Sequence, residues 1–306
     1  MLLSFRRPSE KSTASAVSDT VQKYGRTFHG YKEGKYILPN DEKERKRLDL
    51  QHELARRMLN GKLHLAPVSN PGRVLDFGAG TGIWTVEFAT ENPKSDILGI
   101  DLSAVQRDDT PPNCRFELGD VEDEWHYPHK FNFIHGRYIL LYITDIPKLM
   151  RSIYDNLAPG GYVEIVELLL GMQPLDPSTD RRHPILAWND MMVAGMEKIG
   201  KDPCAGASVK KWMREAGFVN VTETKYSVAS TPWWPKGEEA KIRGAMMMDN
   251  ILNVAEGMTT RMFVEVYGWS REQVDAYLVD TTKAFQDPSF HAFTNGVCVW
   301  GQKPPA

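Results

Sequence analysis

Cysteine is scarce in this chain, which has only three cysteines among its 306 residues: Cys114, Cys204 and Cys298. An odd number at wide spacing neither builds a disulfide framework nor matches a metal-ligand motif, so we predict no metal site and a reducing, intracellular environment. Long hydrophobic runs are missing too, because no stretch approaches the roughly 18 apolar residues of a transmembrane helix. The sequence therefore predicts a cytoplasmic protein without a membrane span and leaves a nuclear location open.

An excess of charge of either sign is also missing. The 37 Lys and Arg residues nearly balance 40 Asp and Glu residues, and the net charge is -3. This balance excludes a general electrostatic attraction to nucleic acid or to an anionic membrane. With 42% hydrophobic and 25% charged residues, the composition is typical of an ordinary globular protein.

The first 167 residues show a clear change of pattern at residue 73. Residues 1–25 are rich in Ser, Thr and Lys, and we expect a mobile tail; residues 26–72 are expected to form an N-terminal helical cap with a helix at about 40–61. From residue 73 short apolar runs alternate with helical stretches, which predicts a doubly wound, parallel α/β sheet. The expected strands are 73–77, 97–101, 114–118, 131–135 and 162–167, with helices that begin near Gly82, Ser103 and Asp145.

Beyond residue 167 two segments are longer than the crossovers of such a sheet require. We interpret them as helical insertions, at about 171–205 and 236–286, that build a substrate pocket. Between them the pattern predicts a helix at 208–217 and a strand at 219–228, and a strand at 291–300 closes the chain. Residues 73–306 are therefore expected to form one domain.

The strongest motif is Val74-Leu-Asp-Phe-Gly-Ala-Gly-Thr-Gly82, in which an apolar strand with an acid near its end precedes three glycines. Such glycines let a ligand approach the backbone at the carboxyl edge of a sheet. Their G-x-G-x-G spacing differs from the G-x-G-x-x-G of dinucleotide-binding folds. The spacing therefore argues against a dinucleotide-dependent oxidoreductase.

Acidic residues accompany the next two expected strands. Asp101 ends the strand 97–101, where a carboxylate can accept hydrogen bonds from both hydroxyls of a ribose. Asp120 follows the strand 114–118 in Phe116-Glu-Leu-Gly-Asp-Val121. Alone each acid is a weak signal, but their order after the glycine motif makes the series specific.

In this order the segments resemble the motifs of class I methyltransferases that depend on S-adenosylmethionine (SAM), a family with a Rossmann-like fold. The resemblance implies SAM as cofactor, with Asp120 on the adenine amino group and the backbone near His135 and Gly136 on the methionine end. Asn132 departs from the pattern, because the family usually has an acid there. The expected cofactor-binding residues are Asp76, Gly78, Ala79, Gly80, Thr81, Gly82, Asp101, Leu102, Asp120, Val121, His135, Gly136, Tyr31 and Tyr36.

Three flanking segments, 28–42, 47–52 and 119–125, are similar to the LaeA-like methyltransferases of filamentous fungi. This resemblance implies a SAM-dependent methyltransferase of fungal secondary metabolism, and we expect O-methylation of a hydrophobic small molecule. Two alternatives stay open: a SAM-binding regulatory protein that acts in a protein complex, and a methyltransferase-fold enzyme that catalyses SAM-assisted cyclisation without methyl transfer. A protein partner or a homodimer is compatible with all three.

Methyl transfer from a sulfonium requires alignment and exclusion of water rather than a metal or a covalent nucleophile. A base helps to deprotonate a hydroxyl acceptor, and the candidate histidines are His29, His135 and His183. Tyr31 and Tyr36 are candidates to face the sulfonium through cation–π contact. The expected acceptor pocket comprises adaptable apolar side chains in or beside the insertions: Trp188, Met191, Met192, Trp233, Trp234 and Met247.

Overall fold

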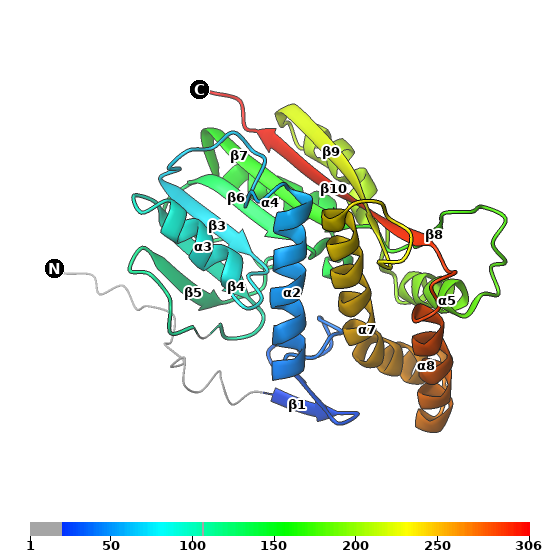
Figure 1. Cartoon of the computed structure of the whole chain (residues 1–306). Helices are drawn as coiled ribbons and strands as arrows, with labels where there is room; N and C mark the ends of the chain where they lie inside the picture. Colours follow the sequence, from blue (N-terminus) through cyan, green and yellow to red (C-terminus); the bar gives the residue numbers. More distant parts are fainter. Residues whose placement is uncertain (1–19, 106) are drawn as a thin grey trace.

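The structure is a computed structural model that describes residues 20–105 and 107–306 (Figure 1). Its central sheet has five parallel strands in the order β5-β4-β3-β6-β7, and the antiparallel β10 joins the β7 edge. β9 and the short β8 both pair antiparallel with β10. The strands are β3 (Arg73–Phe77), β4 (Asp96–Asp101), β5 (Cys114–Leu118), β6 (Phe131–Arg137), β7 (Leu157–Leu168), β8 (Gln173–Pro174), β9 (Val219–Ala229) and β10 (Ala292–Gln302). This confirms the expected α/β sheet.

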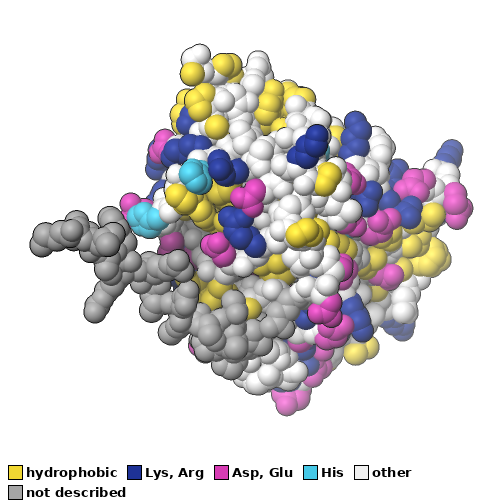
Figure 2. All heavy atoms as spheres, turned by 90° about the vertical axis from the view of Figure 1, so that its left-hand side faces the viewer, with side chains coloured by type: hydrophobic (Ala, Val, Ile, Leu, Met, Phe, Trp, Pro, Cys, Tyr) yellow, Lys and Arg dark blue, Asp and Glu magenta, His cyan; other side chains and the backbone are white. Residues whose placement is uncertain are grey.

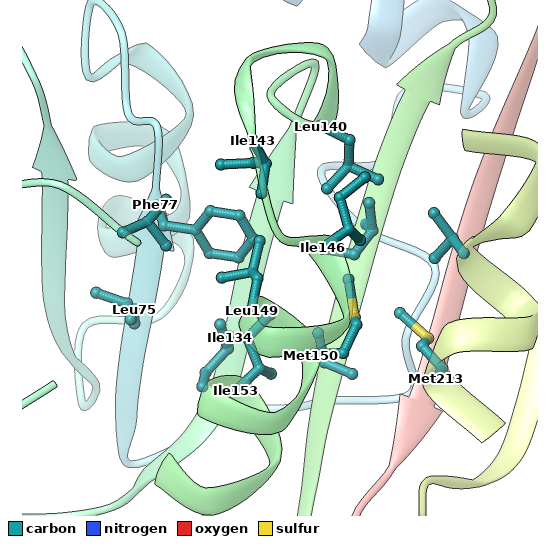
Figure 3. Close-up of a cluster of buried hydrophobic side chains, with 14 of the residues drawn as sticks. Leu75, Phe77, Ile134, Leu140, Ile143, Ile146, Leu149, Met150, Ile153 and Met213 are labelled. Atoms are coloured by element: carbon teal, nitrogen blue, oxygen red, sulfur yellow. The ribbon is translucent and has the colours of Figure 1, made fainter. Parts of the chain in front are cut away.

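Helices cover both faces of the sheet because alternate strand residues point to opposite sides. On one face Val74 and Phe133 pack against Trp84 of α3 (Ile83–Glu91). On the other face Leu75 and Ile134 pack against α4 (Ile146–Asn156) and α6 (Val209–Glu215). Figure 3 shows this second cluster, with Leu149, Met150 and Ile153 of α4 beside the strands and Met213 of α6 to one side.

A second, helical layer has its own core. It consists of α2 (Glu42–Met58), α5 (Pro184–Lys198), α7 (Glu238–Tyr267) and α8 (Arg271–Phe285), with buried side chains such as Leu54, Trp188, Met258 and Phe263. Figure 1 shows α5, α7 and α8 gathered on the lower right, with α2 between them and the sheet. The layer also includes much of the predicted insertions, whose role as insertions remains a proposal.

Local signals explain why several helices begin or end where they do. The Asp41 carboxylate caps α2 by accepting the Glu44 N–H at 3.0 Å, and Asp145 caps α4 by accepting the Lys148 N–H at 2.8 Å. Gly268, with a φ of 72°, ends α7 and separates it from α8. The helices expected at 40–61 and after Asp145 are therefore confirmed, and the helical region 236–285 consists of two helices.

Three expectations were wrong. No helix begins near Ser103, because the described residues between β4 and β5 are irregular; two consecutive prolines, Pro111 and Pro112, oppose a helix there. The N-terminal tail does not extend to residue 25, since Thr20–Lys23 (β1) pair with Arg26–His29 (β2); residues 1–19 of that predicted tail lie outside the described part. Within the described part of the N-terminal region, 20–72, α2 is the one helix, so this region is not purely helical.

Candidate functional site

A cavity of about 440 Å³ lies along the carboxyl ends of β3, β4 and β6 and continues between α2, α5 and α7. One half is lined by the glycine-rich loop and the residues that follow β4 and β5. The other half is lined by apolar side chains of the helical layer: Trp188, Met192, Met247, Ile251, Val254 and Met258. Most of the predicted cofactor residues line the first half: Asp76, Gly78, Ala79, Gly80, Thr81, Asp101, Leu102, Asp120, Val121, His135, Tyr31 and Tyr36.

The glycine-rich loop is built from residues with positive φ. Gly78, Gly80 and Gly82 have φ values of 70°, 59° and 77°, which L side chains rarely adopt. A Cβ on Gly82 would lie 2.6 Å from the Phe116 ring. Gly82 and Gly136 are not among the residues that line the cavity: Gly82 precedes α3, and Gly136 packs against the Phe77 ring, where a Cβ would lie at 2.2 Å.

Asp101, at the end of β4, is held by two backbone groups. Its Oδ2 accepts the Gly80 N–H at 2.9 Å and its Oδ1 accepts the Ser103 N–H at 2.8 Å. Burial raises the pKa of Asp101 to about 6, while these two hydrogen bonds oppose the rise. Each oxygen keeps a further lone pair, so the carboxylate fits the expected pair of ribose hydroxyls.

Asp120 is engaged by the N-terminal segment. Its Oδ2 accepts hydrogen bonds from Lys32 at 2.8 Å and from Lys35, and its Oδ1 accepts the Glu122 N–H at 2.9 Å. Although burial disfavours its charge, these contacts hold the pKa of Asp120 below its usual value. Lys35 also pairs with Glu122 at 2.9 Å. The loop 31–36 is thereby attached to Asp120 and Glu122, which follow β5.

Asp76 and His135 form a buried pair on adjacent strands. The His135 Nδ1–H donates to Asp76 Oδ1 at 2.9 Å, because a carboxylate only accepts, and Asp76 Oδ2 accepts the Thr85 hydroxyl at 2.6 Å. The imidazole stacks on Trp84 with ring centroids 3.6 Å apart. Burial lowers the pKa of His135, so the ring is neutral at pH 7. Within the described chain its Nε2 has no hydrogen-bond partner.

The other two candidate histidines lie in different surroundings. His29 lines the cavity, but its Nδ1–H donates to the Tyr31 carbonyl at 2.8 Å and its Nε2 accepts the Tyr36 N–H at 3.1 Å. His29 therefore has no free ring nitrogen and shapes the loop 31–36. His183 precedes α5, stacks on Phe290 at 4.1 Å and does not line the cavity. Only His135 combines a position in the cavity wall with an unengaged ring nitrogen.

The predicted acceptor residues divide into two groups. Trp188, Met192 and Met247 line the cavity, and the Trp188 Nε1–H donates to Thr259 at 2.8 Å. Met191, Trp233 and Trp234 do not line it. The indoles of Trp233 and Trp234 instead donate to the carbonyls of Phe285 and Ala292 and brace the chain around α8 and β10.

Sequence reasoning missed several polar residues of the cavity wall. Glu167 near the end of β7 accepts the N–H groups of Ile139 and Leu140 at 2.9 Å, and burial raises its pKa to about 7. Glu167 lies near the end of β7 much as Asp101 lies at the end of β4. An acid near the end of an expected strand is the sequence signal that could have identified Glu167. Arg47 and Asn250 meet at 2.7 Å although they lie 203 positions apart, and Arg137 lies in an extension of β6 by two residues. No local sequence pattern predicts those contacts.

The surface carries charges of both signs side by side (Figure 2). On the face shown in Figure 2, Lys and Arg side chains are interspersed with Asp and Glu, so its described residues form no extended basic surface. Over the described residues, no helix has the length and apolarity to cross a bilayer. Nor do three or more His, Cys, Asp or Glu side chains of the described chain cluster as a metal site would require.

Known proteins of similar sequence include methyltransferases and regulators of secondary metabolism. Residues 50–223 match a family model described as "Methyltransferase domain". The chain is 36% identical to "Methyltransferase pytC" of Aspergillus terreus over 96% of this chain and 92% of the relative. It is 30% identical to "Probable methyltransferase tdiE" of Emericella nidulans, covering 96% and 93%. It is also 30% identical to "Secondary metabolism regulator laeA" of Aspergillus fumigatus, covering 94% and 78%.

Proposed function

Since the chain belongs to the SAM-dependent methyltransferases of fungal secondary metabolism, with their Rossmann-like fold, we propose that it methylates a hydroxyl group of a hydrophobic small molecule. The observation that carries this proposal is that one continuous cavity joins the glycine-rich loop and Asp101 to the apolar walls of α5 and α7. An acceptor in the helical half would meet the cofactor without exposure to bulk water.

The cofactor, when bound, supplies a methyl group on a positively charged sulfur that leaves as a neutral thioether. Asp101 would hold the ribose, and the positive-φ glycines keep side chains away from the loop so that a ligand can lie close to the backbone. The apolar walls would orient the acceptor and exclude water. His135 is the proposed base, because its neutral ring, fixed by Asp76, has Nε2 available to accept a proton.

Calorimetric titration with SAM and S-adenosylhomocysteine (SAH) is the first test. We expect micromolar binding of both by the unmodified protein and a loss of roughly 10-fold or more in the Asp101→Ala variant, which lacks the ribose acceptor. Circular dichroism of the variant controls for folding. Binding that is equal in both proteins would remove Asp101 from the cofactor site, and no binding by either would overturn the proposed function.

The acceptor is then sought by incubating the protein with SAM and fractionated fungal metabolites, with mass spectrometry to detect a gain of one methyl. His135→Gln is expected to bind SAH normally but to transfer the methyl group roughly 100-fold more slowly, as expected for loss of a general base. SAM binding without any methylated product, together with a stable partner in pull-down, would favour the regulatory alternative. A converted product with an unchanged number of methyl groups would favour cyclisation.

A further inference from the structure

Arg137 is a partly buried cation in the wall of the cavity. It is the last residue of β6 and follows Gly136, which pairs with Phe77 on β3. Arg137 therefore lies beside Gly78, where the glycine-rich loop begins. Burial lowers the pKa of its guanidinium, because this position solvates a charge poorly.

A chain of side chains fixes this guanidinium. Arg137 Nη2 donates to His52 Nδ1 at 2.8 Å, and because a guanidinium only donates, His52 Nδ1 must accept. The proton of His52 is therefore on Nε2, which donates to Glu87 Oε2 at 3.0 Å. Burial and the neighbouring Arg137 lower the pKa of His52 to about 3, so the ring stays neutral. Arg56 donates to the same Glu87 oxygen at 2.9 Å and completes the chain.

A comparison with Arg47, another arginine in the cavity wall, shows what Arg137 lacks. Arg47 is neutralised by Glu44, which accepts from Nε at 3.0 Å and from Nη2 at 2.6 Å, and Asn250 accepts from Nη1 at 2.7 Å. Arg137 forms no ion pair with any carboxylate of the described residues; its partner is a neutral imidazole. A charge that is partly removed from water and has no counterion is unfavourable, so this site is suited to an anion supplied by a ligand.

The backbone beside Arg137 is strained in a way that supports a functional role. Tyr138 has a φ of 57°, which is uncommon for an aromatic residue, and its N–H donates to the Val166 carbonyl at 2.9 Å. The Arg137 guanidinium lies 5.7 Å from the centre of the Tyr138 ring. The turn therefore holds the cation against the cavity wall.

Building on the function proposed above, we propose that Arg137 binds the α-carboxylate of the cofactor's methionine moiety, with His52 as its positioning residue. The methionine carboxylate is the one anionic group of SAM, and the glycine-rich loop places the cofactor next to Arg137. A guanidinium can bind a carboxylate through two parallel hydrogen bonds, and His52 leaves several N–H groups of Arg137 available for them. A carboxylate on the acceptor is the other possible source of the anion.

The test compares SAH with its analogue that lacks only the α-carboxylate, by calorimetry on the full chain. In Arg137→Gln we expect SAH to bind roughly 10- to 100-fold more weakly, while the affinity for the analogue changes less than about threefold. Arg137→Lys should recover part of the loss, because it keeps the charge without the paired donors. Thermal unfolding of each variant establishes that it folds.

Two variants of His52 separate positioning from packing. His52→Leu removes the acceptor for Arg137. It should weaken the binding of SAH but not the binding of the analogue. His52→Gln offers an oxygen to Arg137 and an amide N–H to Glu87, so it should restore SAH binding. If both variants weaken SAH binding equally, the shape of the His52 side chain, and not its hydrogen bonds, determines the affinity. That result would remove His52 from the proposal.

The outcomes separate the sources of the carboxylate. If Arg137→Gln weakens both ligands alike, or leaves SAH binding unchanged, the assignment to the cofactor is overturned. Unchanged SAH binding with loss of methyl transfer would assign Arg137 to an anionic acceptor instead. Failure of the proposed function would look different, as absence of SAH binding by the unmodified protein.

Discussion

At the scale of single residues, if Asp101 holds the cofactor as proposed, its ionisation makes cofactor binding sensitive to pH. Burial raises its pKa to about 6, above its usual value of 3.8, so the folded protein takes up a proton on this carboxyl as the pH falls through 6. A protonated carboxyl loses the charge that strengthens its hydrogen bonds to ribose hydroxyls. We predict that the affinity for SAH is constant above pH 7 and falls toward pH 5.

Protonation of Asp101 has opposite effects on ligand binding and on folding stability: it weakens SAH binding but favours the folded state. Since the folded pKa of Asp101 is raised, its contribution to stability is fully present below pH 3.8 and is lost as the pH rises through 6. Calorimetry between pH 5 and pH 8 checks the binding prediction, with Asp101→Asn as the matched variant, whose weaker affinity should not change in this window. A titration curve that is the same in both proteins would assign the pH effect to another group.

At the scale of elements, the loop 31–36 acts as a cover of the cofactor half. Tyr31, Lys35 and Tyr36 line the cavity, and Lys32 and Lys35 attach the loop to Asp120 beyond β5. Tyr36 also packs edge to face on Tyr142 at 4.4 Å. We therefore expect the loop to open, and these ion pairs to break, before a ligand leaves.

We predict that the double substitution Lys32→Gln/Lys35→Gln speeds dissociation of SAH by roughly 2- to 10-fold, the range expected for two partly exposed ion pairs. Stopped-flow displacement measures this rate. High salt should speed dissociation from the unmodified protein in the same direction, because it screens these pairs. Lys43→Gln, which removes an exposed pair to Glu256 away from the loop, is the control. An unchanged dissociation rate in the double variant would show that the lysines do not hold the cover.

The helix starts and loops show which features the sequence could predict. Asp41, Asp145 and the glycine motif are local signals, and the helix starts and the loop they predicted are confirmed. The helix expected near Ser103 was wrong: the described residues that follow Asp101 are irregular, and Pro111 and Pro112 lie ahead of β5. Asn132, where an acid was expected, accepts the Arg73 N–H at 2.9 Å and supports the start of β3.

Contacts between distant segments account for what sequence patterns could not predict. Lys32 and Asp120 are 88 positions apart, and His52 and Arg137 are 85 apart. Neither pair has a periodic or motif signal, since each depends on how α2 and its preceding loop pack over the sheet. Most residues that line the glycine-rich half of the cavity were therefore predictable, whereas the groups that hold or neutralise them were not.

At the scale of the whole molecule, the cavity lies where the sheet and the helical layer meet. Thr81 of the glycine-rich loop donates to Asp49 of α2 at 2.6 Å, and α2 in turn packs along α7. α2 therefore connects the half of the cavity that the glycine-rich loop lines to the half that α7 lines. The stability of this junction depends on the buried network of Glu44, Arg47 and Asn250, whose side chains are less than a tenth exposed.

We predict that Asn250→Leu lowers the free energy of unfolding by about 1 to 3 kcal/mol, because it leaves Arg47 Nη1 buried without an acceptor. Urea unfolding measures this change. The matched control is Asn253→Leu, three residues along α7, where the amide only donates to the Asp249 carbonyl of its own helix, and its effect should stay within about 0.5 kcal/mol. Because the network joins α7 to α2, whose Asp49 accepts the Thr81 hydroxyl of the glycine-rich loop, Asn250→Leu should also weaken SAH binding. Equal destabilisation by the two variants would mean that Arg47 is satisfied without Asn250 and that α2 and α7 are joined by apolar packing alone.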